Sequence, residues 1–327
     1  MSVAICRRYI MGATQKVEWL AGIARKIGLA PNEIFLKLHL LALKIGIQVI
    51  PKHYYSSVAD LYYLRSNRHL WQKKSTLPGI HCPVEDQVNA LKAVCLPFQK
   101  EYRGNPYYTK AVSEEMGLGY GPIEAQALHG VVRHFKPHHI IEVGSGVSTY
   151  CSLQAMEMNG RGEILCIEPY PSQALKSLPQ IRIMECMVQQ TPLETFDLLE
   201  SNDLLFIDST HTVKPGSDVN YLVLEVLPRL RPGVIVHFHD IYLPYDYQID
   251  ILNNFFQWSE TSLLRAFLIH NSKAKILFCM SHLHEERQDV LKDVFPDYEP
   301  LSTPGGIYEG RYPLQGHFPG SIYIRII

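Results

Sequence analysis

The chain has 327 residues, of which 46% are hydrophobic, enough to form one large core and a smaller additional part. Its 31 Lys and Arg balance 32 Asp and Glu, so no basic excess is present to neutralise phosphates, and nucleic acid is not expected as a partner. The seven cysteines are scattered without a C-x-x-C pair, which argues against a zinc knuckle or a disulfide framework and favours a cytoplasmic protein. No apolar run is long enough to span a bilayer.

Residues 1–50 are expected to form amphipathic helices separated by Pro31-Asn32. The polar faces are basic, so these helices could dock on a membrane surface or a partner, which would make the protein membrane-peripheral. Packing onto the main domain is the favoured alternative, because most amphipathic helices face a core. The residues expected on the two apolar faces are Leu20, Ile23, Ala24 and Ile27, and then Ile34, Leu38, Leu41 and Ile45.

Residues 51–120 follow a less regular pattern that is rich in tyrosine. Such a segment could cap an active site with aromatic walls suited to sugars or rings. It could equally be a helical extension whose tyrosines fill gaps in the packing. No single tyrosine is assigned as a ligand.

Residues 121–327 alternate between strand and helix patterns, which predicts a mostly parallel sheet covered on both faces. We expect an α/β fold with a Rossmann-like seven-stranded sheet and an N-terminal helical extension. The expected strands are 138–143, 163–168, 181–188, 203–208, 233–240, 274–279 and 321–326. Helices are expected over 123–135 and from near Ser148, Ser172, Pro192 and Ser217, the last of them ending near Leu230.

The stretch 140–148 joins an apolar strand, a glycine turn and a helix start, the combination of a nucleotide-type cofactor site. The strand ends in Glu142, and the turn is Gly144-Ser145-Gly146. A carboxylate before the glycines suits a cation or a ribose and would repel a pyrophosphate. S-adenosylmethionine carries a sulfonium, an ammonium and no phosphate, so it is the expected cofactor.

Glu168 ends the second strand, 22 residues after Gly146, where an acid commonly holds ribose hydroxyls. The alternative is that it caps a turn before Pro169. The residues expected to bind the cofactor are Glu142, Gly144, Ser145, Gly146, Ser148 and Glu168.

Acidic and histidine residues end the fourth and fifth strands. Asp208 and Asp240 could bind Mg²⁺ through oxygen, and a nitrogen from His239 would favour Mn²⁺ or another transition metal. His211 could take a hydroxyl proton near neutral pH, so it and Asp208 are the expected catalytic residues. The alternatives are a helix cap for Asp208, a hydrogen-bonded core residue for His239 and a solvent-facing loop residue for His211.

Residues from about 121 to 279 resemble class I S-adenosylmethionine-dependent methyltransferases. The resemblance lies in Glu142-Val-Gly-Ser-Gly146, the Leu230-Arg-Pro-Gly233 turn and a late C-terminal strand. Phe206-Ile-Asp-Ser-Thr-His211 and Phe238-His-Asp240 are similar to bacterial metal-dependent sugar and natural-product O-methyltransferases. In those enzymes an aspartate ending strand four binds the metal, and a lysine or histidine three residues later is the base; the corresponding residues here are Asp208 and His211. The chain departs from them at His239-Asp240, where they have two acidic or amide residues.

The resemblance implies an enzyme that methylates a hydroxyl of a small molecule, sugar or other glycan. One alternative is an NAD-dependent oxidoreductase, but Thr149 stands at the third glycine position of the dinucleotide fingerprint. Another alternative is a non-catalytic binding module that docks through the basic helices. The acceptor and the oligomeric state are not indicated by the sequence.

Overall fold

The computed structural model describes residues 31–50, 55–117, 119–311 and 313–327, and the chain divides into two units between Arg68 and His69. In the first unit, α2 covers Pro31–Leu43 and α3 covers Leu61–Ser66. The exposed apolar residues of α2 include Leu36 and Leu40 as well as Leu38 and Leu41. Apolar side chains therefore lie on opposite faces of the helix, rather than on the single predicted face. The helix expected before Pro31 lies outside the described residues.

The tyrosine-rich segment is mostly helical, and from His69 onward it belongs to the same unit as the sheet. Tyr102 is buried, and its hydroxyl donates to the carbonyl oxygens of Cys95 and Val294 at 3.2 and 2.9 Å. This tyrosine therefore fills a gap in the packing. The elements are α4 (Arg68–Trp71), α5 (Val84–Cys95), η1 (Leu96–Phe98), α6 (Gln99–Tyr102) and α7 (Pro106–Ser113).

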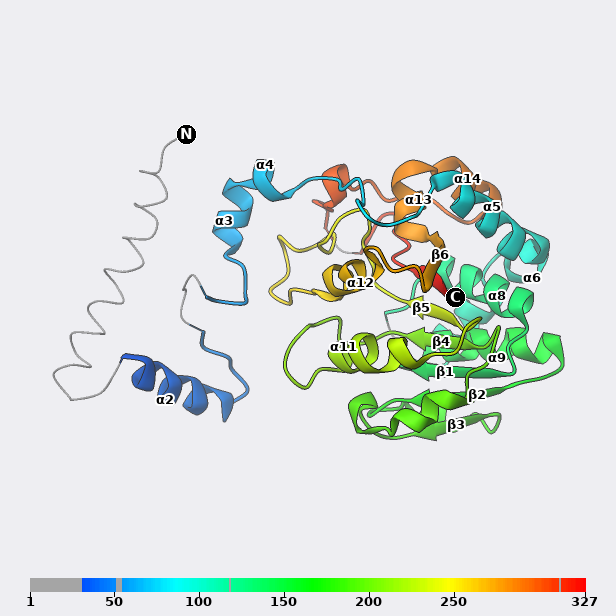
Figure 1. The fold of residues 1–327 in the computed structure, drawn as a ribbon, viewed down its shortest axis with the longest axis horizontal. Helices are drawn as coiled ribbons and strands as arrows, with labels where there is room; N and C mark the ends of the chain where they lie inside the picture. The colour runs from blue at the N-terminus through cyan, green and yellow to red at the C-terminus, as the bar shows by residue number, and fades with distance from the viewer. Residues whose placement is uncertain (1–30, 51–54, 118, 312) are drawn as a thin grey trace. The chain divides into compact units, whose positions relative to one another are not determined.

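The predicted seven-stranded sheet is confirmed, in the order β3-β2-β1-β4-β5-β7-β6 (Figure 1). Only β7 runs antiparallel to its neighbours. The strands are β1 (His139–Val143), β2 (Glu163–Ile167), β3 (Ile181–Met184), β4 (Leu204–Ile207), β5 (Ile235–Phe238), β6 (Ala274–Cys279) and β7 (Ile322–Ile326). The third strand ends before the predicted Val188, because the Cys186 amide turns back to the Met184 carbonyl at 2.9 Å.

Side chains of successive strand residues enter two separate apolar layers, which explains the continuous apolar runs in the sequence. Ile140 packs in the layer that contains residues of α5, α8, α9, α13 and α14, and Ile141 packs in the layer with η4 and α12. The helices after the tyrosine-rich segment are α8 (Pro122–Phe135), α9 (Val147–Asn159), α10 (Gln173–Lys176), α11 (Asp218–Asn220), α12 (Glu260–Leu268), α13 (Met280–Glu286) and α14 (Gln288–Val294). The shorter turns are η2 (Val188–Gln190), η3 (Leu193–Leu198), the π-helical η4 (Tyr221–Val226), η5 (Leu227–Arg229) and η6 (Pro304–Gly306).

The parallel register places the carboxyl ends of β1, β2, β4 and β5 at one edge of the sheet. Open α/β sheets bind their ligands at this edge. Among the described residues, none of the helices combines the length and the apolar character needed to cross a membrane.

Candidate active site

The glycine turn, Gly144–Gly146, is shaped by the close approach of its neighbours. Gly144 has a φ of +79°, and a Cβ there would collide with the carbonyl oxygen of Asp208. At Gly146 a Cβ would lie 3.3 Å from the Met116 carbonyl oxygen. The glycine turn is therefore held between the loop after β4 and the backbone before α8, which leaves no room for a Cβ at residue 144 and little at residue 146.

Glu142 lies behind the glycine turn and is completely buried. Its Oε1 accepts a hydrogen bond from the Ser148 hydroxyl at 2.5 Å, but its Oε2 has no hydrogen-bond partner among the described residues. Burial raises the pKa of this carboxyl to about 8. Within the same described part of the chain, the Ser145 hydroxyl also has no hydrogen-bond partner. Two buried polar groups beside a glycine turn fit a site that completes its hydrogen bonds with a polar cofactor.

Glu168 binds the same turn from the end of β2. Its carboxylate accepts hydrogen bonds from the backbone amides of Tyr170 at 2.8 Å and Ser145 at 3.2 Å. The contact with Tyr170 is the turn cap that the sequence offered as the alternative to ribose binding. The contact with Ser145 shows that the structure also brings this acid to the glycine turn, as the cofactor interpretation requires.

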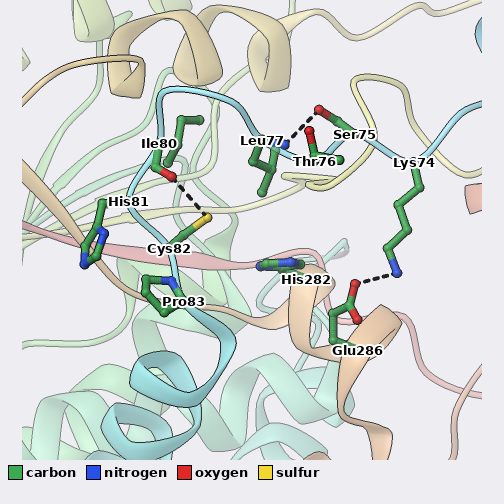
Figure 2. A pocket seen from close by; sticks show the side chains of 10 residues that line it. All are labelled: Lys74, Ser75, Thr76, Leu77, Ile80, His81, Cys82, Pro83, His282 and Glu286. Carbon is green, nitrogen blue, oxygen red and sulfur yellow. Dashed lines mark hydrogen bonds and ion pairs between the residues drawn. The ribbon is translucent and has the colours of Figure 1, made fainter.

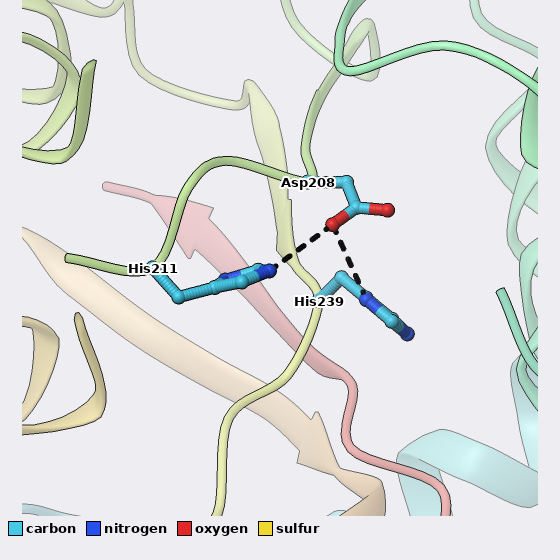
Figure 3. Close-up of side chains that lie close together, drawn as sticks. All are labelled: Asp208, His211 and His239. Carbon is cyan, nitrogen blue, oxygen red and sulfur yellow. Dashed lines mark ion pairs between the residues drawn. The ribbon is translucent and has the colours of Figure 1, made fainter. Parts of the chain in front are cut away.

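The histidine–aspartate cluster, Asp208, His211, His239 and Asp240, forms where β4 and β5 end. The His211 Nε2 lies 3.4 Å from Asp208 Oδ1 and 3.5 Å from Asp240 Oδ2. The His239 Nδ1 lies 3.4 Å from the same two oxygens. Figure 3 shows the two imidazoles directed at the Asp208 carboxylate from different loops. The structure therefore brings all four predicted residues together.

Each imidazole of the histidine–aspartate cluster has a second carboxylate at its other nitrogen. Glu260 Oε2 lies 2.8 Å from His211 Nδ1, and Glu124 Oε1 lies 3.1 Å from His239 Nε2. Glu260 begins α12 and Glu124 lies in the first turn of α8, and both side chains are buried. Neither glutamate was predicted as a site residue.

The backbone of the histidine–aspartate cluster is held in an uncommon conformation. His211 and Asp240 have φ values of +57° and +54°, a region that non-glycine residues seldom occupy. Asp240 accepts a hydrogen bond from the Tyr242 hydroxyl at 3.0 Å, and the Trp258 ring lies 4.7 Å from the His211 ring. Such strain persists where the surrounding structure fixes it, commonly at functional sites.

The charges of the cluster shift one another's pKa values strongly. Burial alone would lower the pKa of His211, but Asp208, Glu260 and Asp240 raise it to about 10. Burial likewise opposes protonation of His239, yet Asp240, Asp208 and Glu124 hold its pKa well above the ordinary value. The pKa of Asp208 is lowered, because the two imidazoles, His239 foremost, outweigh its burial. Burial raises the pKa of Asp240 despite the same imidazoles. The cluster is therefore built to carry positive charge at its centre.

The spacing of the cluster fits a metal ion. Ligands about 2.1 Å from a tetrahedral metal are about 3.4 Å apart. Each of the two imidazole nitrogens lies at this distance from Asp208 Oδ1, and candidate ligand atoms of Asp208, His211 and His239 all lie within 4.8 Å of one another. The His239 Nδ1 has no hydrogen-bond partner among the described residues, although it is buried. Nitrogen and oxygen ligands together suit first-row transition metals better than Mg²⁺, which prefers oxygen alone.

The structure decides between several interpretations of the sequence. His211 is buried, so the alternative of a solvent-facing loop residue is wrong. His237 of β5, two residues before His239, is a buried core residue that stacks on Phe206 at 4.2 Å and bonds to the Ser321 hydroxyl at 3.0 Å. Glu124 and Glu260 were missed because each also stands in the first turn of a helix, where acids are common without any site.

A separate cavity of about 510 Å³ lies beside the start of α13 (Figure 2). Lys74 and Glu286 form an ion pair across part of its lining at 2.5 Å. His282 is held from α5 by the Gln87 amide at 3.0 Å. The lining includes neither the glycine turn nor the histidine–aspartate cluster.

Comparison with known proteins gives a family match at the carboxyl edge of the sheet. Residues 141–241 match the family model described as a methyltransferase domain. This range contains the glycine turn and the whole histidine–aspartate cluster. An uncharacterised protein of Archaeoglobus fulgidus is 27% identical over 173 residues, which cover 49% of this chain and 77% of that protein.

Several solved structures are similar to this chain at low identity. A putative O-methyltransferase from Klebsiella pneumoniae is 13% identical, with a TM-score of 0.41 and coverage of 73% of this chain and 98% of that chain. The O-methyltransferase TomG from Streptomyces achromogenes, solved with S-adenosylmethionine, is 15% identical, with a TM-score of 0.42 and coverage of 73% and 97%. Because these TM-scores are low, the match over residues 141–241 is the finding that indicates a methyltransferase domain.

Proposed function

We propose that this chain is a class I S-adenosylmethionine-dependent methyltransferase, as the match of residues 141–241 to a methyltransferase domain indicates, and that it methylates a hydroxyl group of a small molecule or sugar with the help of a divalent metal ion. The observation that carries this proposal is the histidine–aspartate cluster beside the glycine turn. Gly144 and the Asp208 carbonyl are in such close approach that no Cβ fits between them. A donor at the glycine turn and a cation at the cluster would therefore be neighbours.

The donor half of this site consists of residues at the ends of β1 and β2. We propose that Glu142, the glycine turn and Ser148 hold the amino-acid end of the donor, and that Glu168 holds its ribose. The unpartnered Oε2 of Glu142 and hydroxyl of Ser145 support this assignment. When bound, S-adenosylmethionine supplies a methyl group that is already activated by the sulfonium, so the residues mainly have to align it.

The acceptor half consists of the histidine–aspartate cluster. Asp208, His239 and Asp240 would hold the cation, and His211 faces the same position. Because an acceptor hydroxyl needs a coordination position of its own, three of these residues at a time would bind a four-coordinate ion. A divalent cation, when bound, lowers the pKa of an acceptor hydroxyl and favours its nucleophilic form. The ring of Trp258 and the hydroxyl of Tyr242 border the cluster and would limit the access of water.

The Nε2 atom of His211 has two candidate roles, proton acceptor and metal ligand, and it cannot perform both at once. Its contact with Glu260 would orient the ring for either role. Its separations from Asp208 and Asp240 equal those of His239 within 0.1 Å, which favours the ligand role. The base role stays a prediction.

The test is a methyl-transfer assay with isotope-labelled donor and a panel of sugars and phenols, after removal of metals with a chelator and after their return. The proposal expects transfer to oxygen that stops with the chelator and resumes with metal. Transfer that the chelator leaves unchanged would contradict the metal role. Transfer to nitrogen or sulfur acceptors alone would contradict the acceptor class.

A further inference from the structure

Two buried glutamates contact the imidazoles of the histidine–aspartate cluster at the nitrogens that face away from Asp208 and Asp240. We propose that Glu124 and Glu260 are positioning residues that direct one nitrogen of His239 and one of His211 into the cluster. We further propose that the resulting site takes a nitrogen-preferring transition-metal ion rather than Mg²⁺. The inference deepens the proposed function, but metal binding can be measured without any methyl transfer.

The contacts of Glu260 determine which nitrogen of His211 keeps its proton when a metal ion replaces the proton on the other nitrogen. An ionised carboxylate only accepts hydrogen bonds, so the Nδ1 atom 2.8 Å away must be the donor. The Ser209 hydroxyl donates to the other carboxylate oxygen at 2.8 Å and fixes its direction. The neutral His211 ring then has its lone pair on Nε2, which faces Asp208 and Asp240.

Glu124 acts on His239 in the same way from another helix. Its Oε1 accepts hydrogen bonds from the Gly320 amide at 2.9 Å and the Ser321 hydroxyl at 3.2 Å. These donors identify the oxygen as an acceptor, and the His239 Nε2 forms an ion pair with it at 3.1 Å, so we infer that Nε2 is the nitrogen that carries the proton. The lone pair of the neutral ring is then on Nδ1, the nitrogen without a hydrogen-bond partner among the described residues.

The pairing of each imidazole with a glutamate explains why this cluster should prefer other metals than a site made of oxygen ligands alone. A carboxylate that accepts the distal N–H of an imidazole orients the ring and makes its other nitrogen a stronger ligand. Two such pairs offer two oriented nitrogens alongside two carboxylates, a set that suits zinc, cobalt and related ions. Mg²⁺ binds nitrogen poorly and keeps water in its shell.

The experiment is a titration of the metal-stripped, full-length protein with Co²⁺, followed by visible absorption, with no donor or acceptor present. We expect one Co²⁺ per chain with the strong absorption of a four-coordinate site, and no displacement by excess Mg²⁺. The variants Glu124→Gln and Glu260→Gln should each bind Co²⁺ about 10–100-fold more weakly. Circular dichroism reports whether each variant is folded.

The matched control is Glu101→Gln, because Glu101 bonds to His129 at 2.8 Å away from the cluster. This variant should bind Co²⁺ as the wild type does. Wild-type affinity in both folded cluster variants, or displacement of Co²⁺ by Mg²⁺, would overturn the proposal. If neither variant folds, the competition with Mg²⁺ in the wild type decides. Co²⁺ binding without chelator-sensitive methyl transfer would count against the proposed function and leave this inference standing.

Discussion

The two halves of the carboxyl edge are built by different physical means. The donor half depends on backbone shape, since neighbouring segments leave no space for a Cβ at Gly144 and little space for one at Gly146. Its acids are Glu142 and Glu168. Glu142 is buried, and no cationic side chain among the described residues lowers its pKa. The acceptor half depends on charge, since four carboxylates surround two imidazoles. A shape-based site should tolerate changes of charge and fail on changes of volume, and a charge-based site should do the reverse.

The largest expected effect of a single change is in the acceptor half. His211→Ala should lower the turnover number about 10²–10⁴-fold whether the residue is a base or a ligand, while leaving donor affinity nearly unchanged. The ligand role adds that Co²⁺ affinity falls as well. Turnover is measured with an acceptor from the panel, and S-adenosylhomocysteine affinity by calorimetry. Normal Co²⁺ affinity in an inactive variant would restore the base role, and loss of donor binding would contradict the separation of the two halves.

The donor half should fail on a change of volume. Gly144→Ala adds a Cβ that collides with the Asp208 carbonyl, so we expect at least tenfold weaker S-adenosylhomocysteine binding, about 1.4 kcal/mol or more. The control is Gly160→Ala, which has a similar φ of +71° but no atom within 4 Å of the added Cβ. That variant should lose about 1 kcal/mol of unfolding free energy and no donor affinity. Equal donor affinity in both variants would show that the glycine turn is not the donor site.

The buried acid of the donor half predicts a dependence of stability on pH. The pKa of Glu142 is raised by burial to about 8 in the folded protein, against about 4.3 in an unfolded chain. Between these two pKa values the folded state binds more protons than the unfolded chain. The free energy of unfolding should therefore fall by up to about 1.4 kcal/mol per pH unit as the pH rises from about 4.3 to about 8, with no further loss above pH 8. Glu142→Gln should abolish this part of the pH dependence, because a glutamine side chain does not ionise.

The measurement is denaturant unfolding of the wild type and Glu142→Gln at pH 5 and pH 8. The difference between the two pH values isolates ionisation from any change of packing. A loss of stability with pH that is equal in both proteins would mean that Glu142 is ionised in the fold.

The smallest expected effect concerns a contact at the rim of the cluster. Tyr242→Phe removes the hydroxyl that donates to Asp240 Oδ1 at 3.0 Å, while Asp240 Oδ2 still faces the imidazoles. Co²⁺ affinity should fall by about 0.5–1.5 kcal/mol, the value of one hydrogen bond. A complete loss of Co²⁺ binding would show that the cluster depends on this contact more than on the glutamates.

The contrast between the halves also explains what could be predicted from the sequence. The glycine turn and the strand that leads to it are local in the chain, so Gly144, Gly146 and the sheet were found from spacing alone. Asp208 and His239 follow adjacent strands, and their meeting follows from the parallel register. Glu124 and Glu260 lie 136 residues apart in the sequence, and only packing brings Glu124 to His239 and Glu260 to His211. Strand boundaries such as the end of β3 depend on a single turn hydrogen bond, which residue type does not encode.

The central claim is that the glycine turn binds the methyl donor and not a dinucleotide. Calorimetric titration of the purified protein with S-adenosylhomocysteine, and in parallel with NAD, tests it most directly. The account predicts binding of S-adenosylhomocysteine in the micromolar range, about −8 kcal/mol, and none of NAD. Tight binding of NAD without binding of S-adenosylhomocysteine would contradict it.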